Sequence, residues 1–76
     1  MTTYRWDRYF GIARYACAGR MFPYGRVLYR PNDSAAHTAV IHTQVGYAVT
    51  LGAFNTEAEA RAVIEAVAPL YLAEFG

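Results

Sequence analysis

The segment Leu51–Arg61, LGAFNTEAEAR, predicts a strand that passes directly into a helix. Thr56 is a preferred N-cap residue, and Glu59 three positions later completes a capping box of the S/T-x-x-E type. Glu57 and Glu59 also place negative charge in the first helical turn, where the helix dipole favours it. The sequence therefore predicts a helix that begins immediately after Thr56.

Apolar residues continue the helical spacing after this cap. They recur at i, i+3, i+4 and i+7 and form one apolar stripe: Ala60, Val63, Ile64 and Val67. Pro69 removes a backbone donor and clashes with the preceding turn, so we expect the helix to end or kink near Val67. A final short apolar turn is expected to pack back onto the domain, and it is formed by Leu70, Tyr71, Leu72 and Phe75.

Two β-prone runs precede the helix, at residues 37–43 and 47–51, with Gly46 between them. This pattern predicts a β-hairpin whose inward-facing residues are Ala39 and Ile41. A third strand is predicted at residues 26–30, RVLYR, because its residues alternate in character and successive side chains of a strand point to opposite faces. Arg26 and Arg30 then share one face.

Residues 4–19 are compatible with two structures. As a helix, the segment has one side formed by Trp6, Phe10, Ala13 and Cys17. As a strand from Tyr9 to Cys17, it contains Gly11 as a bulge. Gly11 costs a helix about 1 kcal/mol, whereas the small apolar residues after it are poor strand formers, and we favour a helical or mixed segment.

These elements predict one α+β domain spanning residues 1–76. A small antiparallel sheet of about three strands packs against the C-terminal helix, and the N-terminal segment completes the domain. The single cysteine, Cys17, excludes an internal disulfide and is typical of a reducing compartment. The sequence has neither a signal peptide nor an apolar run of about 20 residues, so we expect a cytoplasmic protein without a membrane partner.

Charge is distributed unevenly along the chain. Residues 1–31 hold six of the seven arginines and one acid, whereas residues 32–76 hold Arg61 and five acids. An asymmetry of this size indicates an interaction surface, or else an attraction between the two halves within the fold.

Catalytic and metal-binding groups are sparse. His37 and His42 are five residues apart, so on one strand they point to opposite faces and do not share a metal. Cys17 is surrounded by alanines and is expected to be a buried, unreactive thiol. The sequence contains no phosphate-binding loop and no nucleophile motif, and it predicts a protein that is not an enzyme and needs neither cofactor nor metal.

Arginine and tyrosine adjoin repeatedly before Pro31. Exposed arginine and tyrosine are enriched at protein interfaces, and arginine with aromatic residues also suits nucleic acid. The alternative is that the tyrosines fill the core and the arginines keep the surface soluble. The candidate binding residues are Arg5, Arg8, Arg14, Arg20, Arg26, Arg30, Tyr15, Tyr24 and Tyr29.

The junction at Tyr47–Val67 resembles the strand and helix of AP2-type and phage-integrase arm-type DNA-binding domains. The residues that carry this resemblance are Gly52, Phe54, Thr56, Glu59 and Ala60. It implies a three-stranded sheet that docks into the major groove through arginines and aromatic residues on its open face. In this sequence, Arg26 and Arg30 fit that role.

The chain as a whole is similar in kind to small phage anti-CRISPR proteins directed at type I systems, including type I-C. That resemblance implies a stoichiometric inhibitor in the host bacterial cytoplasm, as a monomer or small homo-oligomer. Its partner would be a CRISPR-Cas effector subunit with an acidic patch, and nucleic acid is the second choice.

Overall fold

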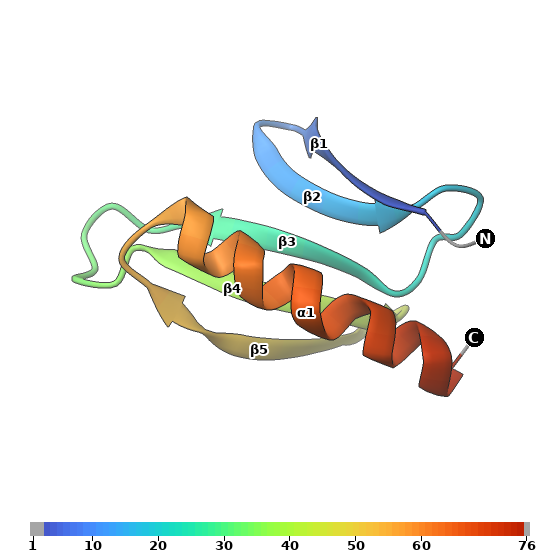
Figure 1. Ribbon diagram of the computed structural model, residues 1–76. Helices are drawn as coiled ribbons and strands as arrows, with labels where there is room; N and C mark the ends of the chain where they lie inside the picture. Colours follow the sequence, from blue (N-terminus) through green and yellow to red (C-terminus); the bar gives the residue numbers. More distant parts are fainter. Residues whose placement is uncertain (1–2, 76) are drawn as a thin grey trace.

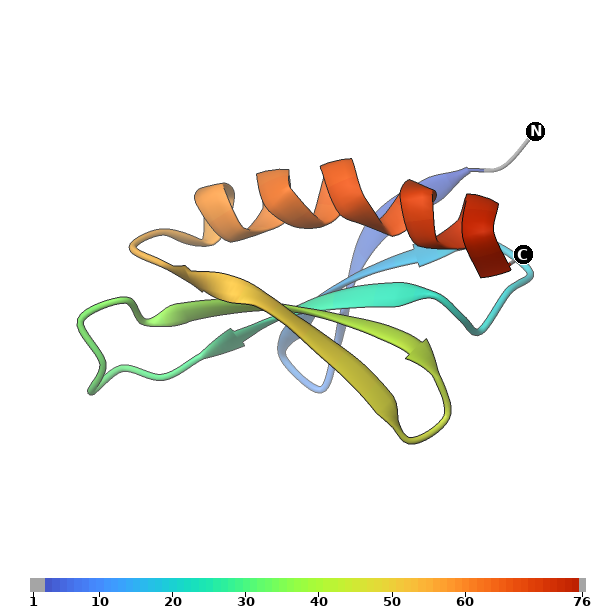
Figure 2. The same cartoon turned by 90° about the horizontal axis from the view of Figure 1, so that it is seen from below.

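A single antiparallel sheet and one helix make up the computed structural model, which describes the backbone of residues 3–75 and the side chains of residues 3–71. The elements in chain order are β1 (Tyr4–Tyr9), β2 (Ile12–Cys17), β3 (Tyr24–Tyr29), β4 (His37–Gln44), β5 (Tyr47–Phe54) and α1 (Glu57–Phe75). The strands lie side by side in the order of the sequence, and α1 covers one face of the sheet (Figures 1 and 2). The α+β prediction is therefore confirmed.

The prediction of about three strands is wrong, because the sheet has five, and the N-terminal segment is not helical. Residues 4–17 form a hairpin whose two-residue turn is Phe10 and Gly11, with φ angles of 51° and 77°. Positive φ at both positions matches the twist that antiparallel strands require. Gly11 is thus a turn residue and not a bulge.

Cross-strand aromatic contacts explain why the hairpin is preferred over a helix. Trp6 lies directly opposite Tyr15, with ring centroids 4.8 Å apart, and Tyr4 stacks on Tyr15 at 5.1 Å. Such pairs stabilise a sheet, and they require the hairpin register, since none of them exists in a helix.

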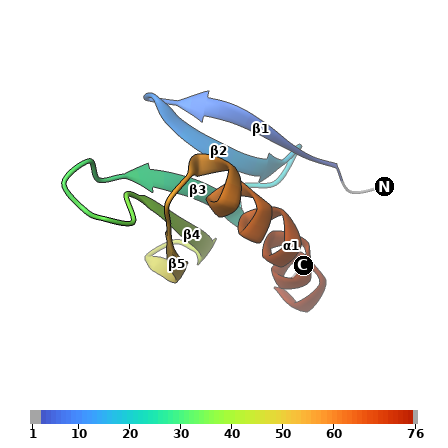
Figure 3. The same ribbon diagram turned by 60° about the vertical axis from the view of Figure 1, so that its left-hand side comes forward.

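The core lies between α1 and the sheet. It is formed by Ala13, Val27, Ala39, Ile41, Ala60, Ile64 and Ala68. The predicted inward pair Ala39 and Ile41 and the predicted helical residues Ala60 and Ile64 are fully buried, which confirms these assignments. The helix packs over β3, β4 and β5, and the β1–β2 hairpin lies to one side of it (Figure 3).

Thr56 caps the start of α1, and Glu59 contacts its hydroxyl group in a variant of the predicted capping box. The backbone N–H of Glu59 donates to Thr56 Oγ1 at 3.2 Å, and the Thr56 hydroxyl donates to the Glu59 carboxylate at 3.1 Å. The helix does not end near Val67 but continues through Pro69 to Phe75. Burial of Ala68 and packing of Tyr71 against the core offset the hydrogen bond that Pro69 removes.

The predicted apolar turn is confirmed only for Tyr71, which packs against the core, whereas Leu70 is exposed. The side chains of Leu72 and Phe75 lie outside the described residues. In the part of the chain that the structure describes, no helix has both the length and the apolar character that a membrane crossing requires.

Gly25 allows close approach of the helix to β3. A Cβ at this position would overlap Cγ2 of Ile64 and crowd Cδ1 of Ile41. We therefore predict that Gly25→Ala lowers the free energy of unfolding by about 1–3 kcal/mol through overpacking, measured by urea denaturation.

An Ile64→Ala background provides the control, because it removes the overlapping methyl group. The cost of Gly25→Ala should shrink in that background. An equal cost in both backgrounds would contradict a steric origin.

Candidate binding face

The sheet face opposite α1 is not covered by any element within residues 3–75 (Figure 2). The residues adjacent in sequence to the core residues Ala13 and Val27 point to this face, because successive side chains of a strand point to opposite faces. The register places two rows across it: Arg5, Ala16, Tyr24 and His42, and next to them Asp7, Arg14, Arg26 and Val40. We call the group Arg5, Tyr9, Arg14, Tyr24, Arg26 and His42 the basic sheet face.

Asp7 is the acid within these rows, and it is paired. Arg14 donates to both Asp7 carboxylate oxygens, at 3.0 and 2.7 Å, and its guanidinium lies 5.1 Å from the centre of the Tyr9 ring. The hydrogen bond from Arg14 lowers the pKa of Asp7 and raises the pKa of Arg14. Arg14 is thereby held in one orientation.

Arg26 lies directly opposite Arg14, and no acid among the described residues forms an ion pair with it. Like charges in this position repel each other across a strand pair. The Nε of Arg26 is buried and lacks a hydrogen-bond partner among the described residues. The sheet therefore presents an unpaired cation beside a paired one, an arrangement that favours an anionic partner.

Aromatic rings border these cations. Tyr24 stacks on His42 with centroids 4.6 Å apart and an interplanar angle of 12°, and Phe22 lies 5.6 Å from Tyr24. Burial and then the nearby Arg26 lower the pKa of His42, so this ring tends to be neutral. A hollow of about 480 Å³ extends from Arg5 and Tyr24 to the β2–β3 loop, where it includes Arg20.

The predicted binding residues separate into several places. Five of them lie on or beside the basic sheet face: Arg5, Arg14, Arg20, Arg26 and Tyr24. Tyr15 packs against the core, where burial raises its pKa. Arg8 faces the helix side, and Tyr29 and Arg30 lie at the far end of β3.

Sequence reasoning did not name Tyr9, Phe22 and His42 as binding residues, although they lie on or beside this face. The signal for Tyr9 was the Phe10–Gly11 turn: once the hairpin is placed, Tyr9 shares a face with Asp7 and Arg5. For His42, it was the alternation along β4, which sets this residue opposite to the buried Ile41.

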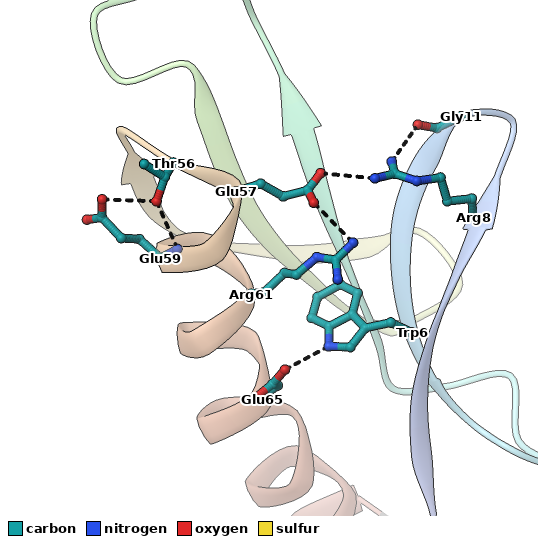
Figure 4. A network of polar contacts seen from close by, with 8 residues as sticks. All are labelled: Trp6, Arg8, Gly11, Thr56, Glu57, Glu59, Arg61 and Glu65. Atoms are coloured by element: carbon teal, nitrogen blue, oxygen red, sulfur yellow. Dashed lines mark hydrogen bonds and ion pairs between the residues drawn. The ribbon is translucent and has the colours of Figure 1, made fainter.

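The β1–β2 hairpin is attached to α1 by polar contacts of Trp6 (Figure 4). Trp6 Nε1 donates to Glu65 Oε1 at 2.8 Å, and the Arg61 guanidinium lies 4.6 Å from the centre of the Trp6 ring. Arg61 also pairs with Glu57 at 3.0 Å, and Arg8 lies 3.6 Å from the same carboxylate. The helix thus carries acids, whereas the opposite sheet face carries arginines.

Two predictions about reactive residues agree with the structure. Cys17 is buried, and His37 and His42 lie on opposite faces of β4. Within the described residues, no three His, Cys, Asp or Glu side chains come together as a metal site.

Comparison with known proteins adds no relationship: no family model, no curated protein and no solved structure matches this chain.

The Asp7–Arg14 pair generates a prediction about pH. Because the folded-state pKa of Asp7 lies below its ordinary value of 3.8, the pair stabilises the fold near neutral pH and is lost as the pH falls through the folded-state value. We expect an NMR titration of the Asp7 carboxyl group to give a midpoint below 3.8, and Arg14→Gln to shift that midpoint upward. The same midpoint in both proteins would contradict the pairing.

Proposed function

We propose that this protein is a non-enzymatic binding protein that inhibits its target by covering an acidic surface with the basic sheet face. In the specific form that the whole-chain resemblance suggests, it is an anti-CRISPR protein and the target is a subunit of a type I CRISPR-Cas effector. The observation that carries the proposal is the row of Arg14 and Arg26 beside Arg5 and Tyr24 on an uncovered sheet face.

The chemistry of this face suits protein carboxylates. An arginine fork donates two parallel hydrogen bonds to a carboxylate, and Arg26 forms no ion pair with any described residue. Arg5 is exposed and adds long-range attraction, which raises association rates more than final affinity. Tyr24 supplies contact area at low cost in side-chain entropy.

The aromatic residues also favour a protein partner over single-stranded nucleic acid. Binding of unpaired bases needs free ring faces on which the bases stack. One ring face of Tyr24 is stacked on His42, and Tyr9 has the Arg14 guanidinium over its ring. Each of these rings therefore has fewer free faces on which a base could stack.

A second candidate function is binding of duplex DNA through the same face. Arg5, Arg14 and Arg26 come from three different strands and point away from the helix, as the resemblance to AP2-type and integrase arm-type domains implies. The open-face residues of the other two strands include no arginine, so the basic area is confined to one side of the sheet.

The test is an infection assay in bacteria that carry an active type I system. Wild-type protein should restore plaque formation, and the double variant Arg5→Glu/Arg26→Glu should lose this activity because it reverses two charges of the face. Arg30→Glu is the matched control, since Arg30 lies outside the face, and it should remain active.

Binding assays with purified components decide between the two candidates. Direct binding to the effector, lost in the double variant at an unchanged melting temperature, supports the protein partner. Binding to duplex DNA with an affinity that falls steeply with salt, by a slope of about −0.9 for each neutralised phosphate, supports the DNA candidate instead. Inhibition by the double variant at the wild-type level would contradict both.

A further inference from the structure

The β1–β2 hairpin and the β3–β4 pair diverge at one end of the sheet. Pairing between β2 and β3 stops at Ala13 and Val27, whereas β3 and β4 remain paired as far as Tyr29 and His37. A hollow of about 460 Å³ lies where the strands separate, and its lining includes Arg8, Gly11, Tyr29, Arg30, His37 and Glu57. We call it the inter-hairpin hollow, and Figure 4 shows the part of its wall that contains Arg8 and Glu57.

Positive charge is in excess around this hollow. Arg8 and Arg30 line it, and Glu57 is the acid among its lining residues. Glu57 is already paired with Arg61 at 3.0 Å, whereas Arg8 lies 3.6 Å from it, beyond hydrogen-bond distance. One carboxylate is therefore shared by two arginines, and Arg30 has no ion pair with a described residue, so the hollow has capacity for a second anion.

His37 lines the hollow beside Tyr29. Its Nδ1 is buried and has no hydrogen-bond partner among residues 3–71, and its ring lies 5.1 Å from that of Tyr29. Because Nδ1 is inaccessible even to a molecule the size of water, a molecule in the hollow meets the His37 ring as an aromatic wall and not as a hydrogen-bond partner.

We propose that the inter-hairpin hollow binds a small molecule that carries an oxyanion, either a carboxylate or a phosphate group. Arg8 and Arg30 donate to the oxyanion, and the rings of Tyr29 and His37 provide an aromatic wall. The volume falls within the range of about 300–1,000 Å³ that is typical of small-molecule sites. This site is separate from the basic sheet face and does not depend on the function proposed for that face.

The experiment is an NMR titration of the ¹⁵N-labelled protein with inorganic phosphate and, separately, with citrate, at an ionic strength held constant with chloride. At least one anion should shift the amide signals of Gly11, Tyr29 and His37 and saturate with a dissociation constant at or below about 1 mM. A response to phosphate alone assigns the oxyanion as phosphate, and a response to citrate alone assigns it as carboxylate.

Two sets of variants locate the binding. Arg8→Gln/Arg30→Gln should weaken binding at least about tenfold, which corresponds to the loss of charge-assisted contacts. Arg30→Gln alone is the second variant, because Arg30 is exposed and its replacement leaves the Arg8–Glu57 contact in place. Arg5→Gln/Arg20→Gln removes the same charge elsewhere and should bind like wild type.

Three results would overturn the proposal. The first is that the shifts of the amide signals do not saturate with either anion. The second is that the shifted amide signals centre on Arg14 and Arg26. The third is that the control variant Arg5→Gln/Arg20→Gln weakens anion binding as much as Arg8→Gln/Arg30→Gln does. The amide spectra of the variants report directly whether each remains folded.

Discussion

The packing of Ile64 over Gly25 and Ile41 fixes α1 on one face of the sheet, and the rest of the surface depends on this contact. One helix can cover only one face of a five-stranded sheet. Because side chains alternate along each strand, the residues between the buried ones are left on the uncovered face. Arg14 and Arg26 are there because Ala13 and Val27 are in the core.

The same alternation divides the basic half of the chain between two surfaces. Arg5 and Arg8 are three residues apart on β1, and they consequently face opposite sides of the sheet. Arg5 joins Arg14 and Arg26, while Arg8 reaches toward Glu57 at the start of α1. The uneven charge of the sequence therefore becomes a difference between faces, with arginines on the open face of the sheet and acids on the helix.

Local signals in the sequence predicted the C-terminal half well. The N-cap at Thr56 and the helical spacing of Ala60 and Ile64 are determined by nearby residues, and so is the alternation around Ala39 and Ile41. The continuation of the helix beyond Pro69 was not predicted. It is favoured by burial of Ala68 against the sheet, and the local spacing of residues does not reveal that contact.

The N-terminal hairpin was missed because its evidence is not local. Phe10–Gly11 is a less characteristic hairpin turn than Asn–Gly, and the pairs that Tyr15 forms with Tyr4 and Trp6 are recognised only once the register is known. The error affected the candidate site as well. A helical interpretation cannot place Arg5, Arg14 and Arg26 on one face, whereas the hairpin register places them together.

The most direct test of whether the basic sheet face is the binding surface is hydroxyl-radical footprinting. The protein is compared alone and in complex with the purified effector subunit that is proposed as its target. Met21, which is 72% exposed at the edge of the hollow beside the basic sheet face, and Tyr9, which is 57% exposed on that face, should become protected. Leu70, which is 67% exposed on the helix, should react as before. Protection of Leu70 with Tyr9 and Met21 unchanged would contradict the assignment of the basic sheet face as the binding surface.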